Sequence, residues 1–245
     1  LITVLICTIS FLGFSQNGLV ELSRNWQFRK VGDIELFPAN VPGCVHTDLY
    51  DNGAIEAPLD ANGEAKCKWI ENESWEYRLI FSKQNLMVGK YQTLIFDGLD
   101  TYASVYLNDN LILVTENMFR RYECEISALL KDENELRVVF ASPIKKGIEK
   151  RNELGFNLPS PSDAGDEKIA SFVRKAGYHF GWDWGPRLVT SGIWKPVSVE
   201  VWDEVRLENF RVRQDSLLEG RMEGTAHFRI ESSVQTKVDL EVFIP

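Results

Sequence analysis

The sequence predicts an all-β fold, an antiparallel sandwich or jelly roll of short strands joined by polar turns. Hydrophobic and polar side chains alternate along several short segments, which is the period of a half-buried strand. Residues that favour tight turns separate these segments, for example Asp97-Gly98 and Asn108-Asp109-Asn110. Closely spaced strands with such turns are typical of sandwich folds.

The clearest strand is predicted over residues 75–81, where Trp75, Tyr77, Leu79 and Phe81 share one face. Further strands are predicted by the same alternation, in chain order, over residues 91–96, 102–107, 111–114, 136–140 and 197–202.

Two helices are expected among these strands. A short one is predicted over residues 125–131, and residues 143–154 carry isoleucine and leucine at helical spacing. Residues 157–166 then form a long irregular segment rich in proline and serine. Loops of this length inside a compact domain are usually functional or disordered. Because this one leads directly into an aromatic segment, we expect a binding loop.

The last part of the chain is expected to begin a second domain. Clean alternation predicts strands over residues 225–231 and 237–244. These are too few to close a sandwich, which needs about seven strands. We therefore expect a jelly-roll domain over residues 18–202 and an incomplete immunoglobulin-like domain over residues 203–245, with its remainder beyond Pro245.

The first residues predict a signal peptide over residues 1–15, with its start clipped. No charged residue occurs before Glu21, and Gly13-Phe14-Ser15 fits a small-x-small cleavage site. A buried helix or strand is the alternative. Export to a periplasm or to the cell exterior is expected, with no membrane segment in the mature form. The Asn72-Glu73-Ser74 sequon is compatible with a lysosomal-type route if the source is eukaryotic.

Charge and composition exclude several partners and cofactors. The net charge of −9 and a pI near 5.0 argue against binding to nucleic acid, which requires clustered Lys and Arg. Cleavage after residue 15 would leave Cys44, Cys67 and Cys124, an odd number at irregular spacing. Buried thiols are expected, and one disulfide plus a free thiol is the alternative. The histidines lie far apart, so we predict no metal site and no cofactor.

The most distinctive segment is Tyr178–Arg187, which sets Asp183 between Trp182 and Trp184. Indole faces pack against the C–H faces of sugar rings, and a carboxylate accepts hydrogen bonds from paired hydroxyls, so the segment predicts a carbohydrate pocket. The alternative is that the tryptophans fill the core. An acid between two large apolar side chains is costly unless satisfied, which favours the pocket.

The conformation of this segment is left open by its sequence. In an extended strand the two indoles would share one face and Asp183 would point the other way. Gly181 and Gly185 instead permit a curled loop in which an indole and the acid converge.

Several motifs together resemble the amino-terminal domain of β-mannosidases, the exo-acting members of glycoside hydrolase family two. They occur in order over residues 22–202: Trp26 and residues 41–49, 69–71, 75–78, 96–103, 117–120, 173–186 and 192–196. The resemblance implies a galactose-binding-like jelly roll, followed by immunoglobulin-like domains and a (β/α)8 barrel. That barrel would hold the two catalytic glutamates of a retaining mechanism. No catalytic residue is therefore expected in this chain.

The resemblance also implies a role for each residue of the aromatic segment. Asp183 would hydrogen-bond hydroxyls of a terminal non-reducing mannosyl residue, and Trp182 would line the same pocket. His179, Trp184 and Arg187 would shape the loop, near the substrate. The implied partners are a β-mannoside or manno-oligosaccharide and a downstream barrel on which the jelly roll packs.

Two other functions remain open, a free-standing carbohydrate-binding jelly-roll module and a purely structural sandwich. Other polar residues are interpreted as structural. Glu71, Glu73 and Glu76 are expected at a solvated rim, and His46 is expected to be hydrogen-bonded.

Overall fold

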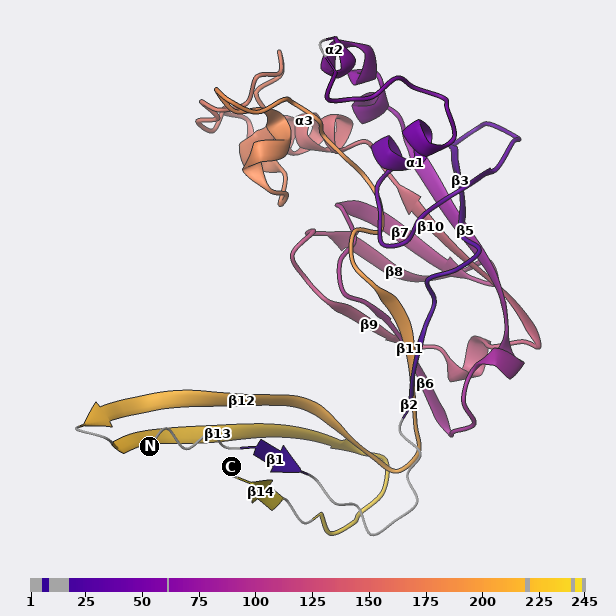
Figure 1. Cartoon of the computed structure of the whole chain (residues 1–245), viewed down its shortest axis with the longest axis vertical. Helices are drawn as coiled ribbons and strands as arrows, with labels where there is room; N and C mark the ends of the chain where they lie inside the picture. Colours follow the sequence, from indigo (N-terminus) through magenta and orange to yellow (C-terminus); the bar gives the residue numbers. More distant parts are fainter. Residues whose placement is uncertain (1–5, 9–17, 61, 219–220, 239–240, 244–245) are drawn as a thin grey trace. The chain divides into compact units, whose positions relative to one another are not determined.

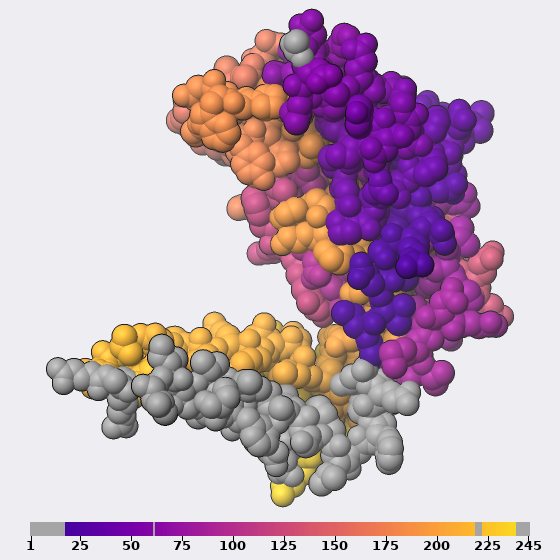
Figure 2. All heavy atoms as spheres, in the orientation of Figure 1, coloured from indigo at the N-terminus to yellow at the C-terminus, as the bar shows by residue number. Residues whose placement is uncertain are grey.

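The computed structural model describes residues 6–8, 18–60, 62–218, 221–238 and 241–243 (Figure 1). The described chain, whose heavy atoms Figure 2 colours along the sequence, divides into two compact units. We call residues 20–86 and 93–199 the sandwich unit. The hairpin unit comprises residues 87–92 and 200–245 together with the first residues of the chain.

Two sheets build the sandwich that the sequence predicts, and every pairing described within them is antiparallel. Among the described residues, one sheet has six strands in the order β4-β3-β5-β10-β7-β8 and the other has four in the order β2-β11-β6-β9. The six-stranded sheet is made of β3 (Gln27–Lys30), β4 (Phe37–Pro38), β5 (Trp75–Ser82), β7 (Tyr102–Leu107), β8 (Asn110–Glu116) and β10 (Glu133–Phe140). The four-stranded sheet is made of β2 (Gly18–Glu21), β6 (Tyr91–Phe96), β9 (Tyr122–Glu125) and β11 (Val197–Trp202).

The core is built from the predicted apolar face of β5. Trp75, Tyr77, Leu79 and Phe81 are buried, whereas Ile80 on the opposite face is exposed. Strand β10 pairs with β5 in an antiparallel register that brings further buried apolar side chains beside this face. The fold class is therefore a jelly-roll sandwich, as predicted.

The predicted strands within residues 75–202 are confirmed, and those over 91–96, 102–107 and 197–202 have the predicted bounds. The helix predicted over residues 143–154 is α3 (Pro143–Leu154). Its N-terminus is capped by the Ser142 Oγ, which accepts a hydrogen bond from the Lys145 N–H at 3.1 Å. It ends at Gly155, whose φ of 78° suits glycine.

Some short elements were not predicted. The helix expected over residues 125–131 is only a 3-10 turn at Ser127–Leu129. Helices α1 (Val45–Asp51) and α2 (Gly63–Cys67) and several short strands were missed. Elements of this length carry too few residues for a periodic pattern. No described helix is long and apolar enough to cross a membrane.

The hairpin unit contains β12 (Val205–Leu218) paired antiparallel with β13 (Arg221–Ser232), and β1 (Ile6–Thr8) paired with β14 (Glu241–Phe243). The strand predicted over residues 225–231 lies within β13. The immunoglobulin-like identity of this part stays a prediction. Apart from β1, the signal peptide predicted over residues 1–15 lies outside the described residues.

Two expectations about side chains are corrected. Glu71 and Glu76 are not on a solvated rim: both are buried, and each meets arginine. Cys44, Cys67 and Cys124 carry free thiols, of which only Cys67 is fully buried. A single sequence shows an acid but not the arginine that folding brings to it, which is why the glutamates were misjudged.

Candidate functional site

The aromatic segment forms a tight turn on the sandwich unit. A 3-10 helix at Gly177–Phe180 ends at Gly181, whose φ is +99°. The N–H of Trp182 donates to the Gly185 carbonyl and the N–H of Gly185 donates to the Trp182 carbonyl, each at 3.3 Å. The segment is therefore curled, with Asp183 and Trp184 at the end of the turn. We call Trp182–Gly185 the tip.

The side chains of the tip face solvent. Trp182 is 46% exposed and Trp184 is 81% exposed. Asp183 is exposed as well, and its carboxylate has no hydrogen-bond or ion-pair partner within the described residues. These tryptophans do not fill the core, in contrast to Trp202, which is buried and stacks on Tyr91 at 4.5 Å. The tip therefore carries exposed indoles and an unpaired, exposed carboxylate on consecutive residues.

Below the tip, Arg187 is buried in an ionic cluster with two acids. Its Nη1 donates to the Glu71 carboxylate, and its Nε lies 3.6 Å from Asp163 Oδ1. Burial raises the pKa of Glu71, and the Arg187 charge opposes this shift. Asp163 also accepts backbone N–H groups of Gly165 and Ile169, each at 2.8 Å. We call Glu71, Asp163 and Arg187 the arginine cluster.

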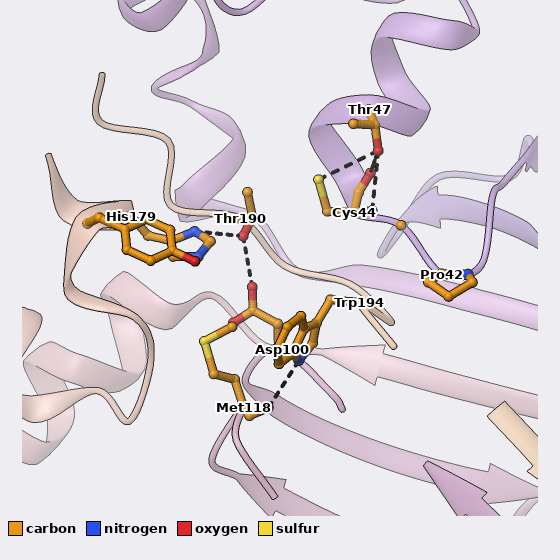
Figure 3. Close-up of a pocket in the computed structure, with 10 residues that line it drawn as sticks. Pro42, Cys44, Thr47, Asp100, Met118, His179, Thr190 and Trp194 are labelled. Carbon is orange, nitrogen blue, oxygen red and sulfur yellow. Dashed lines mark hydrogen bonds between the residues drawn. The ribbon is translucent and has the colours of Figure 1, made fainter. Parts of the chain in front are cut away.

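A second buried cluster joins residues before and after the tip to Asp100, which lies between β6 and β7; Figure 3 shows three of its members, Asp100, His179 and Thr190. The fully buried Lys175 ammonium donates to the Asp100 carboxylate and to Thr190 Oγ1, the latter at 3.1 Å. Thr190 Oγ1 donates to Asp100 Oδ2 at 2.8 Å and lies 3.0 Å from His179 Nδ1. Burial lowers the pKa of Lys175, and the Asp100 charge opposes that shift. We call these four residues the lysine cluster.

His179 belongs to the lysine cluster and not to the tip. Burial, followed by the charge of Lys175, lowers the pKa of His179 to about 4. The ring is therefore neutral at pH 7 and is held by Thr190. Arg187 is thus buried and His179 half-buried, whereas Trp184 points into solvent. The loop-shaping role of these three residues stays a prediction.

A pocket of about 300 Å³ opens beside the lysine cluster (Figure 3). Two of its polar groups are already engaged: the Asp100 carboxylate by Thr190, and the Trp194 indole N–H by the Met118 carbonyl at 3.0 Å. Trp182 and Asp183 do not line it. The lining residues are Pro42, Gly43, Cys44, Thr47, Asp100, Met118, Tyr178, His179, Thr190 and Trp194.

Near the same cluster, His46 on α1 is buried, and its Nδ1 has no hydrogen-bond partner in the described chain. The expectation of a hydrogen-bonded histidine is therefore wrong for this atom. Burial, then the charge of Lys175, lowers the pKa of His46 to about 4. Two residues on from His46, Asp48 accepts the Tyr77 hydroxyl at 2.6 Å, and burial raises the pKa of Asp48 to about 6.

Sequence reasoning missed Asp100, Asp163 and Lys175. Asp100 and Lys175 lay inside motifs used for the resemblance, but nothing in those motifs indicated that they pair. Asp163 had one local signal, since an acid two residues before a glycine often bonds that backbone N–H, as it does at Gly165.

Comparison with known proteins identifies the family. Residues 26–195 match the sequence family described as "Glycosyl hydrolase 2 galactose-binding domain-like". The chain belongs to this family. The resemblance drawn from the motifs is thereby confirmed for most of the jelly roll, and the tip lies within the matched residues.

Relatives of this glycosyl hydrolase 2 chain are much longer. "Beta-mannosidase B" of Emericella nidulans is 36% identical over 228 residues, covering 84% of the chain and 26% of that protein. "Beta-mannosidase B" of Thermothelomyces thermophilus is 35% identical over 189 residues, covering 76% of the chain and 22% of that protein. The chain therefore spans about a quarter of the length of these relatives.

The comparison with solved structures supports the same family. The beta-D-mannosidase of Dictyoglomus thermophilum matches with a TM-score of 0.77 and 39% identity, covering 88% of the chain and 26% of that protein. The beta-D-glucuronidase of the same organism matches with a TM-score of 0.54 and 16% identity, covering 89% of the chain and 33% of that protein. The second match shows the shared fold alone.

Proposed function

We propose that this chain is the amino-terminal portion of a retaining exo-β-mannosidase, which hydrolyses terminal non-reducing β-D-mannose residues. In this proposal the tip lines the subsite of the terminal sugar. The observation that carries it is the tip itself, where an exposed indole adjoins an exposed carboxylate that has no partner in the described chain. The names of the relatives support the substrate class.

The tip has the chemistry that a sugar requires. The Asp183 carboxylate would accept hydrogen bonds from two neighbouring hydroxyls, and the Trp182 indole would pack against the C–H face of the ring. A wall of this kind across the far side of the sugar would leave no room for a longer chain. The enzyme would therefore act on chain ends.

The catalytic glutamates would lie in a downstream (β/α)8 barrel, which needs about 250 residues of its own. A retaining mechanism places the two carboxyl groups about 5–5.5 Å apart, one as nucleophile and one as acid/base. The buried acids Glu71, Asp100 and Asp163 are held by cationic or backbone partners, so none of them is proposed to react with substrate. Export, inferred from residues 1–15, is part of the proposal.

Asp183→Ala in the longer enzyme tests this function. The loss of a contact that strengthens in the transition state is expected to lower kcat/KM for a β-mannoside by about 10²–10³-fold, or about 2.7–4 kcal/mol. The free energy of unfolding should stay within about 0.5 kcal/mol, because the carboxylate is exposed. Asp33→Ala, which removes another exposed aspartate of the sandwich unit, is the matched control and should leave turnover unchanged.

Unchanged turnover in Asp183→Ala would leave only a structural role for the loop. Sequence beyond Pro245 gives an independent test, because the proposal requires a barrel with a glutamate at each of two strand ends.

A free-standing carbohydrate-binding module is the second candidate, because the tip is accessible in this chain alone. Calorimetric titration of the chain with mannose and mannobiose separates the two. Clear binding by the chain favours a module, whereas a subsite completed by another domain should bind very weakly.

A further inference from the structure

We propose that Arg187 is the positioning residue of the tip, and that it acts through the buried arginine cluster with Glu71 and Asp163. The inference rests on the proposed function of Asp183 in sugar binding. Arg187 itself is too deeply buried to reach a sugar held at the tip.

The chain just before the tip, at Gly181, packs against Arg187, which follows the tip. A Cβ built at Gly181, just before the tip, would lie 3.4 Å from the Arg187 Cβ and 2.9 Å from the Ala164 Cβ. The Ala164 N–H also donates to the Phe180 carbonyl at 2.9 Å. The two ends of the turn are therefore packed together against the segment that carries Asp163.

The guanidinium packs closely against that same segment. A Cβ built at Gly165 would lie 2.6 Å from Arg187 Nη2 and 3.0 Å from Arg187 Nε. A side chain at this position would therefore require the guanidinium to shift from its place beside Asp163. Asp163 is held in turn by backbone N–H groups of Gly165, Ile169 and Ala170 at 2.8, 2.8 and 3.0 Å. Arg187 is therefore paired with an acid, Asp163, whose position is fixed by backbone hydrogen bonds.

The other acid of the cluster is anchored as well. The backbone carbonyl of Glu71 accepts a hydrogen bond from the Ser142 hydroxyl at 2.6 Å, and the same hydroxyl oxygen caps α3. Glu71 thus ties Arg187 to a helix of the sandwich unit. The guanidinium donates a hydrogen bond to Glu71, whereas its Nε has no hydrogen-bond partner among the described residues and meets Asp163 Oδ1 at 3.6 Å as an ion pair only. A planar guanidinium can lie between two acids in this way, whereas an ammonium is a single point charge.

The first test measures order at the tip of the 245-residue chain by ¹⁵N relaxation. Wild type should give order parameters near 0.85 at residues 182–185, and Arg187→Met should lower them below about 0.6. Arg206→Met is the matched control. Arg206 is a comparably buried arginine, with 9% of its side chain exposed against 8% for Arg187, and it pairs with two glutamates in the hairpin unit. Its loss should leave the tip ordered.

The second test is a double-mutant cycle on turnover in the longer enzyme. Displacement of a binding group by about 1 Å can cost 10²-fold, so Arg187→Met is expected to lower kcat/KM by up to about 10²-fold. If Arg187 acts through Asp183, the double variant Asp183→Ala/Arg187→Met should be no worse than Asp183→Ala alone. Arg187→Lys should recover part of the loss. If Arg187→Met does not fold, Arg187→Lys and Glu71→Gln replace it in both tests.

Losses that multiply in the double variant, or an ordered tip in Arg187→Met, would overturn the positioning role. The proposed function fails separately, if Asp183→Ala leaves turnover unchanged. In that case the order parameters still decide whether Arg187 holds the tip.

Discussion

The tip and the two buried clusters hold similar side chains in opposite environments. We call the arginine cluster and the lysine cluster together the base. At the tip, Asp183 is exposed and has no partner in the described chain. At the base, Asp100 and Asp163 are buried, and each is held by a cation and by further hydrogen bonds. Burial of a charge is costly unless it is paired, so the partnered acids serve the fold. The unpartnered acid is the one that remains available to a ligand.

The largest loss of stability is expected when Lys175 is removed from the lysine cluster. Lys175→Met would leave the Asp100 carboxylate buried without its cation, and is expected to lower the free energy of unfolding by about 3–5 kcal/mol. Urea unfolding measures the loss. The control is Lys150→Met, whose partner Glu116 is exposed, and which should cost at most about 1 kcal/mol. Equal costs for the two variants would contradict the contrast between base and surface.

Lowering the pH should lower the free energy of unfolding through His46, which is buried near the lysine cluster. The pKa of His46 is about 4 in the folded chain and 6.5 in the unfolded chain. Between these values the unfolded chain binds more protons, so His46 makes the free energy of unfolding rise with pH through this window. A shift of this size corresponds to at most about 3 kcal/mol.

Unfolding of wild type and His46→Gln at pH 4, 5, 6 and 7 isolates this effect, because contributions from Asp48 and other groups cancel in the difference. The advantage of wild type over the variant should grow from pH 4 to about 6.5. A constant difference would show that His46 does not titrate as its burial implies.

Truncation of the partly exposed Trp182 tests whether its indole belongs to the exposed tip or to the core. Trp182→Ala should cost about 1 kcal/mol of unfolding free energy, because 46% of the residue is already exposed. Trp202→Ala removes a buried indole and should cost about 3–5 kcal/mol. Thermal or urea unfolding compares them. A cost at Trp182 equal to that at Trp202 would mean that the indole serves the core.

The smallest effect is expected at the end of the turn. Trp184 is 81% exposed, so Trp184→Ala should change the free energy of unfolding by no more than about 0.5 kcal/mol. Calorimetry under the same conditions checks this. A clear destabilisation would show that Trp184 contributes to the stability of the fold, as the residues of the base do.

Much of the fold and part of the site could be predicted from the sequence. Strands β6, β7 and β11 have the predicted bounds, because alternation and turn residues are local signals. The tip motif was also visible, although two backbone conformations remained open for it. Gly181 allowed both, and its positive φ together with the close contact of Ala164 belongs to the curled one.

By itself the sequence determined the strand pattern, the family and the presence of the Trp-Asp-Trp motif, whereas the exposure of that motif came from the structure. Only the tertiary structure decided which charged residues lie beneath that motif. Glu71 and Arg187 are 116 residues apart in the chain, and Asp100 and Lys175 are 75 apart. A buried acid or lysine is stable only when the fold places an oppositely charged partner beside it. Because these partners are far apart in the sequence, no local sequence pattern identifies them.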